Sequence, residues 1–299
     1  MGMRVATFAS SDRLLQAALK VQAKQSEATL QEASGQISED YGGLGSSAGS
    51  VVSLQSSISM SKAYADAAST AGDRVEAMYD AVDSIIEQIT SMKATLSSFA
   101  STSSDTDELQ VTAEEMLESL ASLMNTQLSG RYLFSGSAVD TAPVDLDSLA
   151  SASSPSSSDT SYYQGDDAIT SVKVSSEQTV TYGVTADDEN FEKALRALSL
   201  VAAGATDDET LSEARDLLDE AISGLATVQT RLSLNASALE TAISDQETYQ
   251  DFASDLVTDL SGVDVAVVAA EMSVYETQLQ AAYSAIGTIA SLTLSSYLS

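Results

Sequence analysis

The feature that most constrains the fold is a strict spacing of apolar residues in the C-terminal part of the chain. Seven residues recur at alternating steps of four and three: Val268, Met272, Tyr275, Leu279, Ala282, Ile286 and Ile289. This spacing places them along one side of a helix and predicts a coiled-coil seam. Because the stretch from Gln278 to Leu298 carries no charge, a helix formed there needs a partner that covers its apolar side.

Three further segments show helical periodicity over many turns. The first, Leu54 to Leu96, keeps a heptad pattern and would form a rod about 65 Å long. We expect a second helix at Glu108 to Leu128 and a third at Asp208 to Leu260, and a shorter helical pattern ends at Gly204. Long helices with short links predict a bundle. The seam predicted for the first segment consists of Leu54, Ile58, Ala65, Ala68, Val75, Val82, Ile86, Ile89 and Leu96, with Ser61, Gly72, Tyr79 and Lys93 at the remaining positions.

The middle of the chain has a different texture. A serine-rich run, "DLDSLASASSPSSSDTS", extends from Asp145 to Ser161 and predicts a flexible surface loop. Between Tyr162 and Val184 apolar residues alternate in part, which predicts two short strands joined near Ser175 to Gln178. A small β-containing insert therefore interrupts a helical rod.

These patterns predict a mainly α fold, in which the N- and C-terminal regions form a long coiled-coil helical bundle and a small β-containing insert lies in the middle of the chain. We expect residues 1–40 and 262–299 to form a terminal coiled-coil layer, with a helix break at Gly262. Residues 41–135 and 187–261 are expected to form the bundle rod. Residues 136–186 are expected to form the outer β-rich insert.

Composition excludes several kinds of chemistry. The chain has neither Cys nor His, which removes thiolate nucleophiles, Cys/His zinc sites and the usual general base near neutral pH. Its net charge of −31 makes nucleic acid and anionic membrane surfaces poor partners. Residues 1–30 nevertheless hold four basic and two acidic side chains, whereas residues 232–299 hold nine acids and no base. This contrast suggests that the two ends lie side by side, although a solvated acidic face would also explain the C-terminal charges.

Pairs of adjacent aspartates are the remaining candidates for site chemistry. Asp166 with Asp167 could in principle support carboxylate hydrolysis, but such pairs more often cap helices and turns. None of the acidic pairs matches a calcium-loop pattern. The sequence therefore predicts no catalytic residue, no cofactor and no metal site.

The start of the chain lacks the uninterrupted apolar core of a secretory signal, since Arg4, Asp12 and Arg13 break it. No window reaches about 18 apolar residues, so we expect no transmembrane helix.

The predicted functional surface is an assembly interface made by both terminal regions. The seven residues of the C-terminal seam contribute one part, and Leu15, Leu19, Leu30 and Ile37 contribute the other. One interpretation is that the seam is simply core within the chain. The interpretation we favour is that it packs against the N-terminal helix and neighbouring subunits together.

Three motifs carry a resemblance that covers nearly the whole chain. They are "NTQLSGRYLFSGSAVDTAPV" from Asn125, "YYQGDD" followed later by "YGVTADDENFEKALRAL" from Tyr182, and "VDVAVVAAEMSVYETQLQAAYSAIGTIASLTLSSYL" from Val263. With the arrangement of helical ends around a β insert, they resemble the flagellin family of bacterial flagellar axial proteins. They are more similar to its members at the junction of hook and filament than to filament flagellin. The N-terminal family signature is present only as "EASGQISEDYGGLGSSAG".

The resemblance implies a non-enzymatic structural adaptor that joins hook to filament by helical head-to-tail assembly. Implied partners are a second junction protein, flagellin and like subunits in a ring, together with an export chaperone that binds the C-terminal region. The implied location is the extracellular flagellum, reached by type III export without a cleaved signal peptide. Two alternatives stay open: a self-polymerising filament flagellin, and a cytoplasmic coiled-coil interaction protein.

Overall fold

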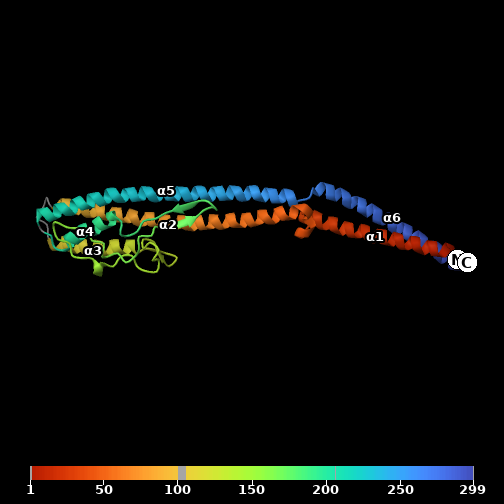
Figure 1. Cartoon of the computed structure of the whole chain (residues 1–299), viewed down its shortest axis with the longest axis horizontal. Coiled ribbons are helices and arrows are strands. Elements are labelled where there is room, and N and C mark those ends of the chain that lie inside the picture. The colour runs from red at the N-terminus through yellow and green to blue at the C-terminus, as the bar shows by residue number, and fades with distance from the viewer. Residues whose placement is uncertain (1, 100–105, 206, 299) are drawn as a thin grey trace. The chain divides into compact units, whose positions relative to one another are not determined.

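The computed structural model describes residues 2–99, 106–205 and 207–298, with side chains described from residue 12 to residue 289 within those ranges (Figure 1). Its helices are α1 (Gly2–Ser34), α2 (Ala48–Phe99), α3 (Thr106–Met124), α4 (Glu189–Ala202), α5 (Asp208–Ser261) and α6 (Val265–Leu298). Its strands are β1 (Gln127–Leu128), β2 (Arg131–Tyr132), β3 (Ser171–Lys173) and β4 (Thr179–Thr181). The prediction of a mainly α fold with a small antiparallel β insert is confirmed.

The predicted bounds hold for α5, whereas α2 extends beyond the predicted Leu54 to Leu96 at both ends, and the second predicted helix was too long. It ends at Met124, and Gln127–Leu128 instead pairs with Arg131–Tyr132 in an antiparallel hairpin. The two turn residues, Ser129 and Gly130, have φ angles of 54° and 76°. Two successive positive φ angles give the primed turn that matches the twist of paired strands, and Gly130 adopts its angle without strain.

The chain forms two compact units, residues 60–248 and residues 1–59 with 249–299. In the larger unit α2 and α5 run antiparallel. Ser61 donates to the Gln246 carbonyl oxygen at 3.0 Å, and Gln229 donates to the Asp83 carboxylate at 2.8 Å. Lys93 forms an ion pair with Asp219 further along the same two helices.

The heptad seam of α2 was half right. Ala68, Val75, Val82, Ile89 and Leu96 are buried as predicted, but the other seam positions are Ala71, Met78, Ile85 and Met92. These four each lie one residue before the predicted Gly72, Tyr79, Ile86 and Lys93, which are only half-buried. Because α2 in this unit also packs on the α3 and α4 side, its core stripe is rotated away from the position that α5 alone would set.

The predicted hairpin is confirmed, since β3 pairs with β4 in antiparallel register. Two side chains tie it to the long helices: Gln246 donates to the Val174 carbonyl oxygen at 3.0 Å, and Arg74 donates to the Tyr182 hydroxyl at 3.1 Å. Phe134, which directly precedes the insert, meets Phe191 of α4 edge to face, with ring centroids 5.7 Å apart, and Val144, Tyr162, Val174 and Val180 of the insert belong to the same buried cluster. The insert and the bundle thus share one core.

The serine-rich run was expected to be flexible, but the structure fixes it by hydrogen bonds to helical carboxylates. Glu213 of α5 accepts from the Ser154 hydroxyl at 2.6 Å and from the Ser156 backbone N–H at 2.8 Å. Glu192 of α4, which is 2% exposed, accepts from the Asp159 backbone N–H at 3.0 Å and pairs with Arg196. The composition of the run is typical of a flexible linker. Its hydrogen-bond partners lie far away in the sequence, so the run's own composition could not show that they hold it in place.

In the smaller unit α1 packs along α6 (Figure 1). The helix break predicted at Gly262 is confirmed, because α5 ends at Ser261 and α6 begins at Val265. Main-chain hydrogen bonds join the break to the end of α1: Ile37 donates to Ser261, and Val263 donates to Gly35. The terminal helix pair therefore starts at a fixed register.

Candidate assembly interface

The C-terminal seam lies against α1 within the same chain. Val268 is 6% exposed and Leu279 is 8% exposed. The other five seam residues are half-buried: Met272, Tyr275, Ala282, Ile286 and Ile289. Lys24 of α1 lies 5.9 Å from the centre of the Tyr275 ring, a cation–π contact that joins the two helices. The chain itself covers part of this seam.

The matching seam of α1 is made of smaller residues than those singled out from the sequence. Ala18 and Ala28 are buried, while Leu14, Val21 and Gln25 are half-buried. These five residues recur at steps of four and three, as a coiled-coil partner requires. This spacing was the available signal in the sequence, whereas the predicted Leu15 and Leu19 each lie one position later and fall on another side of the helix.

The predicted N-terminal interface residues point outward instead. Leu15 is 48% exposed, Leu19 and Leu30 are each 56% exposed, and Ile37 is 37% exposed. The structure therefore does not bring them together with the C-terminal seam. Their part in assembly stays a prediction, and their exposure keeps them accessible to a partner.

The outer side of α6 carries further exposed apolar residues that the sequence reasoning did not name. They are Val265, Val267, Val274 and Tyr283, each 45% to 54% exposed. Val267 and Val274 lie seven residues apart and border a shallow hollow lined also by Ala266 and Ala270. Each terminal helix thus buries one side in the pair and leaves an apolar strip on another.

The hypothesis that the oppositely charged ends lie side by side is confirmed for α1 and α6, which pack together. Arg13, Lys20 and Lys24 are exposed on α1, whereas Glu271 and Glu276 are exposed on α6. Asp12, Glu27 and Glu32 are also exposed on α1, so α1 carries charges of both signs, whereas the described side chains of α6 carry acids alone.

The aspartate pairs serve as caps where the structure describes them. The Ser137 hydroxyl and the backbone N–H groups of Ser137 and Ala168 donate to Asp166, and these hydrogen bonds hold the pKa of Asp166 below its usual value. Asp188 accepts from the Asn190 backbone N–H at the start of α4. A hydrogen-bonded, ionised Asp166 is a weak base, so these contacts favour the structural interpretation.

Within the described residues, no group of three or more Asp, Glu, His or Cys side chains is arranged to hold a metal ion. None of the described helices combines the length and apolarity needed to cross a bilayer.

Comparison with known proteins identifies both ends of the chain. The bacterial flagellin N-terminal helical region matches residues 5–139, and the bacterial flagellin C-terminal helical region matches residues 216–298. The chain belongs to the flagellin family. Family membership places it among the axial components of the bacterial flagellum, which assemble with like subunits and with one another.

Two solved structures share the fold. A protein of Vibrio parahaemolyticus described as a flagellar hook-associated protein is 17% identical, with a TM-score of 0.61 over 75% of this chain and 99% of its own. Flagellar hook-associated protein 3 of Legionella pneumophila is 13% identical, with a TM-score of 0.55 over 69% of this chain and 98% of its own. Among curated proteins, no sequence matches this chain.

Proposed function

We propose that this flagellin-family protein is a structural adaptor between the hook and the filament of the bacterial flagellum. The observation that carries the proposal is the shared fold with two hook-associated proteins over 98% to 99% of their chains. The outward apolar residues of α1 and α6 support it, because an axial protein needs contact surfaces for several neighbours.

Partial burial in the monomer supports a role for the terminal helices in those contacts. Leu15, Leu19, Leu30 and Val274 are about half exposed. Covering the remaining half of each would contribute about 1 kcal/mol per side chain. Association costs about 4 kcal/mol or more, so one such contact is insufficient and several neighbours must act together. A heterologous, head-to-tail contact permits a ring or a tube.

In this proposal the terminal segments, residues 1–40 and 262–299, form the inner layer of the assembly. Residues 41–135 and 187–261 form the rod outside it, and residues 136–186 form the outermost insert. An export chaperone covers the C-terminal region before the chain leaves the cell through the flagellar type III apparatus. The role is structural, without catalysis.

Immunolabelling of intact flagellated cells tests the location. The expected result is one labelled spot where the external filament meets the hook. Label along the whole filament would instead identify a filament flagellin, and absence of external label would favour a cytoplasmic coiled-coil protein. Removal of residues 263–299 should abolish the spot, whereas an exposed substitution in the insert, Ser157→Glu, should leave it in place.

A further inference from the structure

Residues 150–161 of the larger unit form a strap that lies against α4 and α5 without being part of a helix or strand. The two ends of the strap are tied together, because the carboxylate of Asp159 accepts from the backbone N–H groups of Ala150 and Ser161, at 3.0 and 2.9 Å. Side chains of the two helices hold its middle. The strap therefore depends on individual polar contacts and not on the hydrogen-bond ladder of a regular element.

The contact of the strap with α5 is made by Glu213. Its two carboxylate oxygens accept three hydrogen bonds: from the Ser154 hydroxyl at 2.6 Å, from the Ser156 backbone N–H at 2.8 Å and from the Ser156 hydroxyl at 2.6 Å. Hydrogen bonds to an ionised carboxylate are about twice as strong as those between neutral groups. A protonated carboxyl group accepts fewer hydrogen bonds and becomes a donor itself. The hold on Ser154 and Ser156 therefore depends on the charge of Glu213.

The contact of the strap with α4 covers polar side chains. Glu192, which is 2% exposed, accepts from the Asp159 backbone N–H at 3.0 Å and pairs with Arg196. Ser199, which is 8% exposed, accepts from the Ala152 backbone N–H at 3.3 Å. Between the strap and α4 lies a cavity of about 120 Å³, and Glu192, Arg196 and Ser199 are among the residues that line it. This volume has room for several water molecules, so opening of the strap would expose these side chains to solvent.

Acidic groups outnumber basic groups around Glu213. Hydrogen bonds from Ser154 and Ser156 lower the pKa of Glu213, and Arg196 makes a smaller contribution in the same direction. Arg196 also donates to the Ser156 hydroxyl at 3.3 Å. The strap itself, more than a neighbouring cation, thus keeps Glu213 ionised. The charged groups on the elements packed around Glu213 are Asp159 of the strap, Glu192 and Arg196 of α4, and Glu209 and Asp216 one turn away on α5.

The direction of the pH dependence follows from these contacts. A carboxyl group whose pKa is lowered in the folded protein contributes stability above its ordinary pKa, which is 4.5 for Glu213, and this contribution is lost as the pH falls through the lowered pKa. The backbone N–H groups of Ser161 and Ala150 likewise lower the pKa of Asp159. Acid therefore weakens both the Glu213 contact and the tie between the two ends of the strap.

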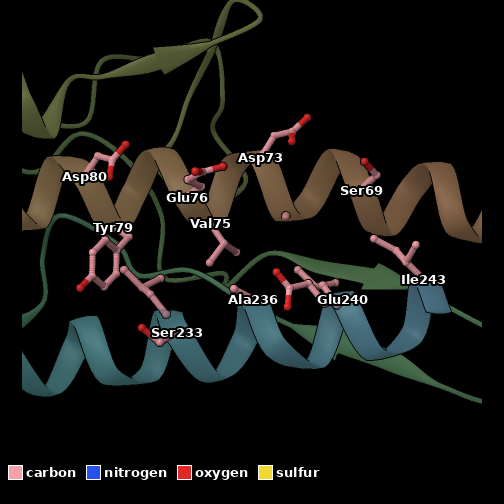
Figure 2. A pocket seen from close by; sticks show the side chains of 13 residues that line it. Ser69, Asp73, Val75, Glu76, Tyr79, Asp80, Ser233, Ala236, Glu240 and Ile243 are labelled. Atoms are coloured by element: carbon pink, nitrogen blue, oxygen red, sulfur yellow. The ribbon is translucent and has the colours of Figure 1, made fainter. Parts of the chain in front are cut away.

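Other carboxylates of the same unit lack such contacts. A groove of about 530 Å³ lies between α2 and α5, and Figure 2 shows Asp73 and Asp80 along the outer edge of α2 beside it. Among the described residues, no hydrogen bond or ion pair involves the side chain of either aspartate. Protonation of these two groups therefore releases no segment, whereas protonation of Glu213 weakens the contact that holds the strap on α5.

We propose that the strap is released by acid: it lies closed on α4 and α5 while Glu213 is ionised, and it detaches when Glu213 takes up a proton. No residue of the strap belongs to the buried core of the unit, so detachment leaves that core in place. The inference is independent of the adaptor role, because it concerns a conformational change within the larger unit alone.

A spin label on the strap tests the release, because the chain has no native cysteine. Full-length protein with Ser157→Cys carries the label at an exposed strap position outside the contacts described above. Its electron paramagnetic resonance spectrum should show restricted motion at pH 7 and fast motion at pH 3. The matched control is a label at Ser176→Cys, which is exposed in the turn between β3 and β4 and should give the same spectrum at both pH values. Equal mobilisation of both labels at pH 3, or a strap label that stays restricted there, would overturn the proposal.

Removal of the carboxylate tests the same contact at pH 7, where acid does not challenge the rest of the fold. Glu213→Ala should raise the mobile fraction of the Ser157 label at least about tenfold, because hydrogen bonds to a charged acceptor are lost. Glu213→Gln keeps one acceptor oxygen and should give an intermediate fraction. Asp216→Asn, an exposed change one turn away, and Asp80→Asn beside the groove should leave the spectrum unchanged. A label as restricted in Glu213→Ala as in the chain with Glu213 would contradict the proposal.

Discussion

The two units of this chain share the same helical periodicity, but their helices are covered to different extents. In the larger unit α2 is covered on more than one side, and residues such as Val82, Ile85 and Ile89 are fully buried. In the smaller unit α1 and α6 bury one side each, and Leu19 and Leu30 stay more than half exposed. A seam filled within the chain stabilises a fold, whereas a helix with one covered side keeps a surface for other molecules.

The largest expected effect is in the core of the larger unit. Phe191 is fully buried against Phe134, so Phe191→Ala should cost about 3–5 kcal/mol in the free energy of unfolding. Urea unfolding followed by circular dichroism would measure it. The matched control is Phe252→Ala, because this phenylalanine is 65% exposed; its cost should stay below about 0.5 kcal/mol. Similar losses for both variants would contradict the burial described for the two residues.

The second prediction concerns the terminal pair. Leu279 is 8% exposed at the α1–α6 seam, and Leu279→Ala should destabilise that pair by about 2 kcal/mol. Hydrogen exchange should accelerate in α6 but not in α4. Leu30→Ala, at a position 56% exposed, should leave exchange unchanged and reduce assembly. If Leu30→Ala accelerated exchange as much as Leu279→Ala, the division of α1 into covered and free sides would be wrong.

Limited proteolysis compares the units in the unmodified monomer. Because α1 and α6 each have one covered side, cleavage should begin in them and spare α2 from Leu54 to Phe99 and α3 from Thr106 to Met124. Mass spectrometry of the fragments identifies the order of cuts. If α1 and α6 resisted the protease as well as α2, the apolar sides of both helices would already be covered within the monomer.

A smaller effect is expected where the serine-rich segment is held. The hydroxyls of Ser154 and Ser156 keep the pKa of Glu213 below its usual 4.5. A lowered pKa means that this contribution is present above about pH 4.5 and is lost as the pH falls through the pKa in the folded protein. Glu213→Gln should cost about 1 kcal/mol at pH 7 and less at pH 3. The matched control, exposed Glu247→Gln on the same helix, should show neither effect.

The smallest effect is expected at the ion pair between Lys93 and Asp219. Both side chains are more than a third exposed, at 39% and 54%. Asp219→Asn should therefore change the free energy of unfolding by no more than about 0.5 kcal/mol, with little dependence on salt. A loss above 1 kcal/mol in urea unfolding would show that this pair is shielded from water.

The sequence predicted the elements whose packing depends on one partner. The seam from Val268 to Ile289 was found at the right positions because a two-helix contact follows the heptad repeat directly. The seam of α2 was half found, because additional helices rotate its buried stripe toward Met78 and Ile85. The β1–β2 hairpin was missed because its signal is one Ser-Gly turn in a helical context.

The candidate interface was predictable only in part for a related reason. The prediction named Leu15 and Leu19, yet the α1–α6 contact covers Leu14 and Ala18 one residue earlier. Hydrophobicity alone does not say which side of a helix meets its own chain and which meets another molecule. The groove between α2 and α5, which Gly72 and Ala236 help to line, could not be predicted from the sequence, because it depends on how the two helices pack and not on the pattern of either one.

The paired helix breaks near Gly35 and Gly262 have a mechanical consequence. Both lie at one level, and two main-chain hydrogen bonds join them, from Ile37 to Ser261 and from Val263 to Gly35. Bending at this level would tilt α1 and α6 together, because these two hydrogen bonds prevent one helix from sliding along the other.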